Sequence, residues 1–122
     1  MRILLVLLGL LSFGAVANAE ITVKEYRTAM SSGKESQVQL TRLYVAGVGE
    51  GILVANSMAE RINTPLFCQP EKLALAIDNF ISIIDRIIKD VTPKAPPAEL
   101  DDTPIPIMLM LGMQETFPCP AK

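Results

Sequence analysis

Four stretches of the chain carry apolar residues at the three- and four-residue steps of an α-helix. They predict helices at about 22–32, 35–62, 70–90 and 103–116. The third stretch has a wide, isoleucine-rich apolar stripe, which is typical of a helix that faces the core. The pattern therefore predicts an all-α fold, a small single-domain bundle of about four helices.

Capping residues mark where three of these helices are expected to begin. Thr22 and Glu25 have the spacing of a capping box, in which each side chain bonds the backbone near the other. Pro70 suits the first position of the third helix, because its missing N–H costs nothing there. Thr103 is expected to cap the last helix, with Pro104 at its first position.

The last predicted helix is apolar on every side. From Ile105 to Met113 almost every residue is apolar, and methionine recurs. A helix of this kind lies in the middle of a domain or in a subunit interface. The flexible thioether side chains of methionine fill irregular gaps well, which suits either place.

The second predicted helix contains an unusual run of small residues. Its apolar face is expected to comprise Leu40, Leu43, Tyr44, Gly47, Val48, Gly51, Ile52, Ala55, Met58, Ala59 and Ile62. Glycine in a helix interior costs about 1 kcal/mol relative to alanine, so the run needs a compensating contact. We expect Gly47, Gly51 and Ala55 to form a ridge that another backbone packs against closely, within the chain or across a dimer. The alternative is a kink or break near Gly49.

Residues 1–19 have the pattern of a secretory signal peptide. Arg2 gives a positive start, an almost wholly apolar run follows, and small residues end at Ala19. The apolar run is well short of the roughly 20 residues that a spanning helix needs, so a signal peptide is preferred to a transmembrane anchor. Cleavage after Ala19 leaves residues 20–122 as one domain, exported to the periplasm. It has ten basic and thirteen acidic residues, a net charge of −3.

The two cysteines of the chain predict one disulfide. Cys68 follows the second predicted helix and Cys119 follows the last one, each beside a phenylalanine and a proline. An exported chain meets an oxidising compartment, where such pairs form and persist. Closing a loop of about 50 residues stabilises a fold by about 4 kcal/mol in the chain-entropy model. The alternative is two free thiols or an intermolecular pair.

The proline-rich segment, residues 92–103, is predicted to be a loop between the third and last helices. Its three prolines prevent a continuous helix, and three acidic residues follow one another closely. A loop of about twelve residues in a small domain is long enough to suggest a function. The candidate partner-binding residues are Glu99, Leu100, Asp101 and Asp102. The alternative is an ordinary solvated connector.

The composition argues against catalysis. Histidine is absent, which removes the commonest general base, the serine and cysteine nucleophile pairs that depend on histidine, and most zinc sites. The glycine run lacks the Lys-Ser/Thr of a phosphate-binding loop. There is also no basic patch of the kind that binds nucleic acid. We expect no enzyme activity, no catalytic residues, no cofactor, no metal site, no nucleic-acid partner and no membrane contact after signal cleavage.

Three short motifs, in this order, resemble the Rap/Tai family of periplasmic immunity proteins. They are YVAGVGEG at 44–51, FCQP at 67–70 and FPC at 117–119, and the similarity covers about 36–119. Proteins of that family protect bacteria against peptidoglycan amidase effectors delivered by type VI secretion. The resemblance implies an all-α homodimer in which Cys68–Cys119 is the internal disulfide. It also implies a protruding loop that plugs the active-site cleft of the amidase.

The expected function is therefore that of a periplasmic immunity protein that binds and occludes such an amidase toxin. The alternative is a structural or chaperone-like periplasmic protein of the same fold without a toxin partner. In that alternative, the methionine-rich last helix is a promiscuous apolar surface. A third class is a small-molecule carrier that uses the aliphatic interior.

Overall fold

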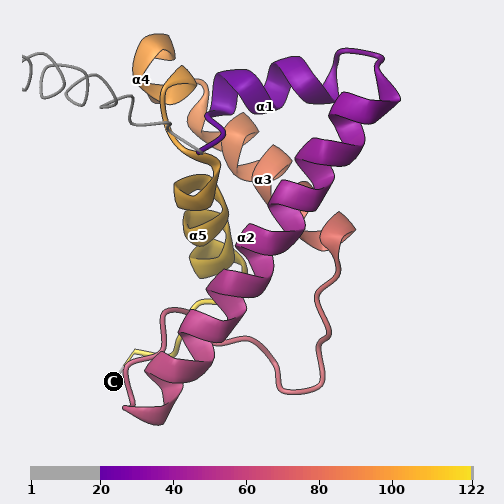
Figure 1. The fold of residues 1–122 in the computed structure, drawn as a ribbon. Coiled ribbons are helices and arrows are strands. Elements are labelled where there is room, and N and C mark those ends of the chain that lie inside the picture. Colours follow the sequence, from indigo (N-terminus) through magenta and orange to yellow (C-terminus); the bar gives the residue numbers. More distant parts are fainter. Residues whose placement is uncertain (1–19, 122) are drawn as a thin grey trace, which may run out of the picture.

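The computed structural model describes residues 20–121, so the predicted signal peptide lies outside the described residues. The described part consists of helices without strands, and 66% of its residues are helical. The helices are α1 (Val23–Met30), α2 (Glu35–Arg61), α3 (Ile77–Val91), α4 (Pro97–Asp101) and α5 (Ile105–Thr116) (Figure 1). The predicted all-α fold is confirmed, with one helix more than expected.

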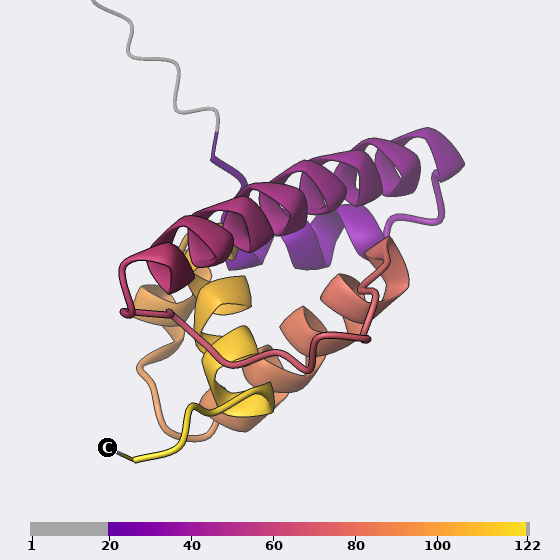
Figure 2. The ribbon, with the colours of Figure 1, turned by 90° about the horizontal axis from the view of Figure 1, so that it is seen from below.

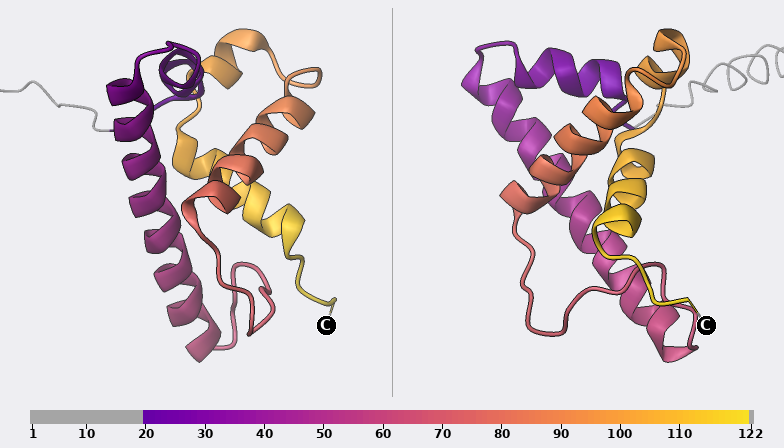
Figure 3. Two further views of the ribbon diagram at one scale, coloured as in Figure 1. Left: turned by 90° about the vertical axis from the view of Figure 1, so that its right-hand side faces the viewer. Right: turned by 180° about the vertical axis from the view of Figure 1, so that it is seen from behind.

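The long α2 spans one whole side of the molecule, and the other helices lie on the opposite side of it (Figure 2). α3 and α5 cross and pack against each other, and both contact α2 (Figure 3). α1 folds back along α2 and also contacts α4. The frame is thus a crossed pair of helices held against a single long one.

The core is aliphatic, as the composition predicts, and α3 supplies the largest share of it. The buried side chains of α3 are Phe80, Ile81, Ile83, Ile84, Ile87 and Ile88. Ile105, Met108, Leu109 and Met113 of α5 are buried with them. The isoleucine-rich stripe is therefore core. α5 is buried on one side only, because Ile107 and Leu111 are 50% and 42% exposed, so it does not lie wholly in the middle of the domain. The alternative, a subunit interface, stays a prediction.

α3 begins seven residues later than predicted, at Ile77. The predicted start at Pro70 is wrong because the chain turns there, with the N–H of Leu73 donating to the carbonyl of Pro70 at 3.0 Å. The helix is capped further along the chain. The Asn79 side chain accepts from the N–H of Ala76 at 2.8 Å, which satisfies an N–H group at the helix start.

α5 begins at Ile105 with Pro104 before it, so the prediction that Thr103 caps this helix is wrong. The Thr103 hydroxyl donates to the carbonyl of Glu99 at 2.7 Å. Its carbonyl accepts from the N–H of Val23 at 2.9 Å. Thr103 therefore joins α4 to α1, and the proline-rich start of α5 has fewer N–H groups to cap.

The close approach on α2 occurs at Gly49, not at the predicted ridge. A Cβ atom on Gly49 would lie 2.7 Å from Cζ of the buried Phe80 ring and closer still to Cε2 and Cδ2. A Cβ atom on Gly47 or Gly51 would meet nothing within 4 Å, and Ala55 is exposed. The ridge does not pack within the chain. α2 is also continuous through Gly49, so the alternative of a break there is wrong.

The predicted apolar face of α2 is largely its outer face. The residues that α2 buries against the rest of the domain are Thr41, Val45, Gly49, Ile52 and Asn56. Leu40, Leu43, Met58 and Ile62 are instead between 65% and 71% exposed. Among the described helices, α2 alone is long and apolar enough to cross a membrane, by length and composition only.

Candidate functional site

The predicted disulfide between Cys68 and Cys119 is present, with the two Cα atoms 4.8 Å apart. The N–H of Cys68 also donates to the carbonyl of Phe117 at 2.8 Å. The Phe67 and Phe117 rings lie beside this bond, with centroids 6.5 Å apart. The bridge ties the segment that leads into α3 to the end of α5, and it suits an oxidising compartment.

A buried asparagine holds the same segment from the other side. The Asn56 side chain on α2 is 4% exposed. Its Oδ1 accepts from the N–H of Leu66 at 2.7 Å and from the N–H of Phe67 at 3.2 Å. Its Nδ2 donates to the carbonyl of Phe67 at 3.1 Å. Sequence reasoning missed Asn56, although it continues the buried positions of α2 at helical spacing.

The proline-rich segment 92–103 is not a simple loop, because its second half folds into α4 with Pro97 at the first position. Leu100 is 3% exposed and belongs to the core. This corrects the assignment of Leu100 as a partner-binding residue, since its side chain faces inward. Its burial instead fastens α4 to the domain.

Contacts with α1 hold the base of this segment. Arg27 donates through Nη1 to Oδ1 of Asp101 at 3.3 Å and through Nη2 to Oγ1 of Thr92 at 3.0 Å. The ion pair is half-exposed, so its net contribution to stability is below about 1 kcal/mol. Together, the two hydrogen bonds of Arg27 join both ends of the segment, at Thr92 and Asp101, to one side chain. Arg27 was not among the predicted site residues.

The candidate acidic residues therefore have different surroundings. Glu99 and Asp102 are exposed, whereas Asp101 is partly buried and paired with Arg27. Two of the three predicted carboxylates thus point to solvent from an anchored short helix. Glu99 and Asp102 are the acidic residues of the segment best placed to meet a partner.

α1 itself is fixed to α3 by a partly buried hydrogen bond. The hydroxyl of Tyr26 donates to Oδ1 of Asp85 at 2.8 Å. Burial raises the pKa of Tyr26, and the hydrogen bond to Asp85 and its negative charge raise it further, while Arg42 acts in the opposite direction. The platform under the proline-rich segment is therefore tied to the core at physiological pH.

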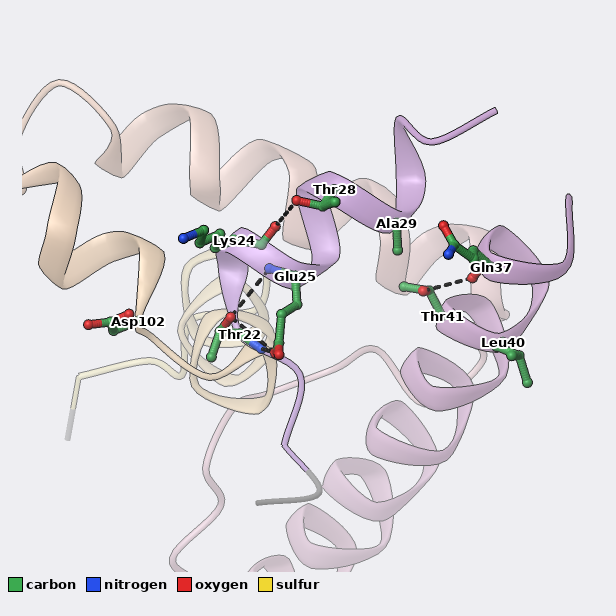
Figure 4. Close-up of a pocket in the computed structure, with 9 residues that line it drawn as sticks. All are labelled: Thr22, Lys24, Glu25, Thr28, Ala29, Gln37, Leu40, Thr41 and Asp102. Carbon is green, nitrogen blue, oxygen red and sulfur yellow. Dashed lines mark hydrogen bonds between the residues drawn. The ribbon is translucent and has the colours of Figure 1, made fainter. Parts of the chain in front are cut away.

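A groove of about 640 Å³ runs beside the segment, between α1 and the first turns of α2 (Figure 4). Its lining residues are Thr22, Lys24, Glu25, Thr28, Ala29, Gln37, Leu40, Thr41 and Asp102. Lys24 and Asp102 lie at one end and Leu40 at the other (Figure 4). The groove is wide and mixed in character, which suits a protein segment better than a small buried ligand.

Most polar groups that line the groove already have partners within the chain. Thr22 and Glu25 complete the predicted capping box, with the N–H of Thr22 donating to Oε2 of Glu25 at 2.9 Å. Thr28 and Thr41 donate to backbone carbonyls one turn earlier in their own helices. The groove therefore offers shape and a few charges at its rim, and it holds no arrangement of nucleophile and base.

Within residues 20–121, no three acidic or cysteine side chains gather as metal ligands would. Comparisons with protein-family models, with curated proteins and with solved structures give no match. The sequence motifs and the geometry of the site are therefore the features that indicate the function of the chain.

Proposed function

We propose that the chain is a periplasmic immunity protein that binds and occludes a peptidoglycan amidase toxin delivered by type VI secretion. The resemblance of its three motifs to the Rap/Tai family gives the substrate class of the toxin. The observation that carries the proposal is the proline-rich segment 92–103. Its exposed carboxylates, on Glu99 and Asp102, project from a base that is fixed on α1 and in the core.

An anchored segment suits inhibition because it loses its conformational entropy when the chain folds and not when the partner binds. Leu100 in the core and the bonds of Arg27 hold the segment in one conformation before a partner arrives. A preorganised loop loses less conformational entropy on association, so more of the contact free energy remains as affinity. Inhibition by occlusion also needs no catalytic residue in the inhibitor.

The exposed carboxylates of Glu99 and Asp102 are complementary to a partner whose active-site cleft has a basic rim. Charges at the edge of an interface mainly raise the association rate and make it depend on salt. Asp101 contributes less to this field, because the guanidinium of Arg27 lies beside it. The proposal therefore assigns electrostatic steering to Glu99 and Asp102.

The test is binding of residues 20–122 to purified peptidoglycan amidase effectors of type VI secretion, measured by calorimetry and by stopped flow. Reversing the charge at both Glu99 and Asp102 to lysine is expected to slow association at least tenfold and to flatten its salt dependence. Glu71→Lys with Glu115→Lys, two charge reversals at exposed positions outside the segment, is the matched control. Unchanged rates in the Glu99 and Asp102 variant would refute the role of the segment.

The chaperone-like alternative depended on a methionine surface on the last helix. Met108 and Met113 are buried in the core. Met110 is partly buried, and the large apolar side chains that α5 exposes are Ile107 and Leu111. The methionines therefore do not form the exposed surface on which this alternative depended.

A further inference from the structure

The groove between α1 and the first turns of α2 is continuous with the proline-rich segment. Asp102, one of the two exposed carboxylates of that segment, lines the groove together with residues of α1 and α2 (Figure 4). A partner that meets Asp102 therefore also lies over the groove. The groove belongs to the surface to which the proposed function assigns the toxin, although that function gives the groove itself no role.

The walls of the groove are fixed before any partner binds. The capping box of Thr22 and Glu25 secures the start of α1. The hydroxyls of Thr28 and Thr41 donate to carbonyls of their own helices, at 2.8 Å and 2.9 Å. These side chains do not have to reorder when a ligand enters. A groove of fixed shape loses little conformational entropy when it is filled, so more of the contact free energy remains as affinity.

The charged side chains of the groove leave one carboxylate in excess. Glu25 and Asp102 contribute two negative charges and Lys24 one positive charge, which gives a net charge of −1. The ion pairs within residues 20–121 involve Asp101 and Asp78, so the carboxylate of Asp102 has no basic partner there. A lysine or arginine of a bound segment would supply that partner through a charge-assisted hydrogen bond.

The wall on α2 presents a polar side chain that is free to bind a ligand. The backbone carbonyl of Gln37 accepts from Thr41, but its side-chain carboxamide bonds no group of residues 20–121. A carboxamide offers both donors and an acceptor, which match the C=O and N–H groups of a main chain. An α-helix satisfies those groups within itself, whereas an extended segment leaves them available. The wall therefore favours an extended segment over a helix.

The end of the groove opposite Asp102 is apolar. Leu40 is 68% exposed there, and Ala29 lines the groove from the last turn of α1 (Figure 4). From Thr22 to Ala29 the helix advances by about 10 Å. An extended chain covers that length in about three residues. The charged end and the apolar end thus match two side chains of one short extended segment.

On the basis of the proposed function, on which this inference rests, we propose that the groove binds an extended segment of the amidase beside its active-site cleft. A lysine or arginine of that segment pairs with Asp102. A large apolar residue, about three or four positions along, packs against Ala29 and Leu40, and the main chain between them bonds Gln37. The exposed carboxylates then govern the rate of association, and the groove governs the lifetime of the complex.

The first test alters the groove without changing its carboxylates, and it uses purified peptidoglycan amidase effectors of type VI secretion. Ala29→Leu fills the apolar end and is expected to make the complex dissociate about tenfold faster, with an unchanged association rate in stopped flow. Gln37→Met keeps the length of an exposed side chain but removes its carboxamide, and it should speed dissociation about fivefold. Ala46→Leu, at a partly exposed helical alanine outside the groove, is the control and should change neither rate.

The second test identifies the bound segment. Gln37→Cys is labelled with a benzophenone reagent in the disulfide-bonded protein and irradiated in the complex with the amidase, and the crosslinked peptide is identified by mass spectrometry. The peptide is expected to border the active-site cleft and to carry a basic residue three or four positions from a large apolar one. A peptide without that pair, or from a face remote from the cleft, would overturn the proposal.

Three results distinguish a failure of the groove from a failure of the proposed function. If charge reversal at Glu99 and Asp102 slows association but Ala29→Leu and Gln37→Met leave dissociation unchanged, the groove has no role and the immunity function stands. If no amidase binds the unaltered protein, both are overturned. If Ala29→Leu changes the mass of the free protein in sedimentation and leaves amidase binding unaltered, the groove binds a second copy of this chain and the proposal is overturned.

Discussion

Replacing Gly49 by alanine tests the packing of α2 on α3 at a single atom. The added Cβ would overlap the Phe80 ring, with Cζ at 2.7 Å and two further ring atoms nearer. Ordinary carbon contacts lie at about 3.5–4.0 Å, so the ring or the helix must move by roughly 1 Å. Phe80 is 2% exposed, and its neighbours leave the ring no open space.

The expected effect combines two opposing terms. Overpacking of a core by one methyl group costs about 1–3 kcal/mol. Alanine gains about 1 kcal/mol over glycine in a helix interior. We expect Gly49→Ala to lower the free energy of unfolding by up to about 2 kcal/mol. The matched variant Gly47→Ala meets no atom within the chain and should raise the unfolding free energy of the monomer by up to about 1 kcal/mol.

Urea denaturation of dilute, monomeric protein, followed by circular dichroism, measures both variants. Gly49→Ala should unfold at a lower urea concentration than the unaltered protein, and Gly47→Ala at a higher one. In a chain that also carries Phe80→Leu, Gly49→Ala should lower the free energy of unfolding by less, because the added methyl group no longer meets the phenylalanine ring. Equal stabilities of the Gly49→Ala and Gly47→Ala variants would refute the reasoning.

Three further predictions concern the supports of the site. Cys119→Ser should lower the free energy of unfolding by about 4 kcal/mol, since the bridge closes a loop of 51 residues. It should weaken partner binding only as a consequence of this lost stability. An unchanged urea denaturation curve would contradict the prediction. Asn56→Leu should cost roughly 3 kcal/mol in the same assay, because three backbone groups lose their partner, and an effect below about 1 kcal/mol would refute the clamp. The raised pKa of Tyr26 means that the native state keeps this proton when the unfolded chain loses it, so stability should fall as pH rises above about 10. Tyr26→Phe should flatten that dependence, and an equal slope in both proteins would show that other groups cause it.

Periodicity and cysteine usage predicted most of the frame. The α2 bounds, the isoleucine-rich core face of α3 and the disulfide were all predicted, because each depends on a local or compositional signal. The starts of α3 and α5 were misplaced for another reason. Pro70 and Thr103 fit the local rule for a helix start. However, Pro70 begins a turn that the N–H of Leu73 closes, and the carbonyl of Thr103 accepts from the N–H of Val23 in α1.

On α2, the pattern of apolar residues alone did not identify the face that is buried. The outer face of the helix carries large apolar residues, among them Leu40 and Ile62, whereas the only large apolar residues on its buried face are Val45 and Ile52. Periodicity does not say which apolar face meets the core when both are present. The buried face was the less obvious, because Thr41, Gly49 and Asn56 interrupt it.

The candidate site was predicted only as a segment. Proline and charge content located residues 92–103, but neither shows that Leu100 enters the core. The pairing of Asp101 with Arg27, 74 residues away, leaves no local signal in a sequence. The distinction between free and paired carboxylates therefore required the tertiary structure.

The most direct test of the proposed function is the hydrolysis of peptidoglycan by type VI amidase effectors during titration with residues 20–122. One such amidase is expected to lose all activity at a stoichiometric ratio. Reversal of charge at Glu99 and Asp102 is expected to slow the onset of inhibition, while Glu71→Lys with Glu115→Lys leaves it unchanged. Full amidase activity in the presence of excess folded, disulfide-bonded protein would contradict the account.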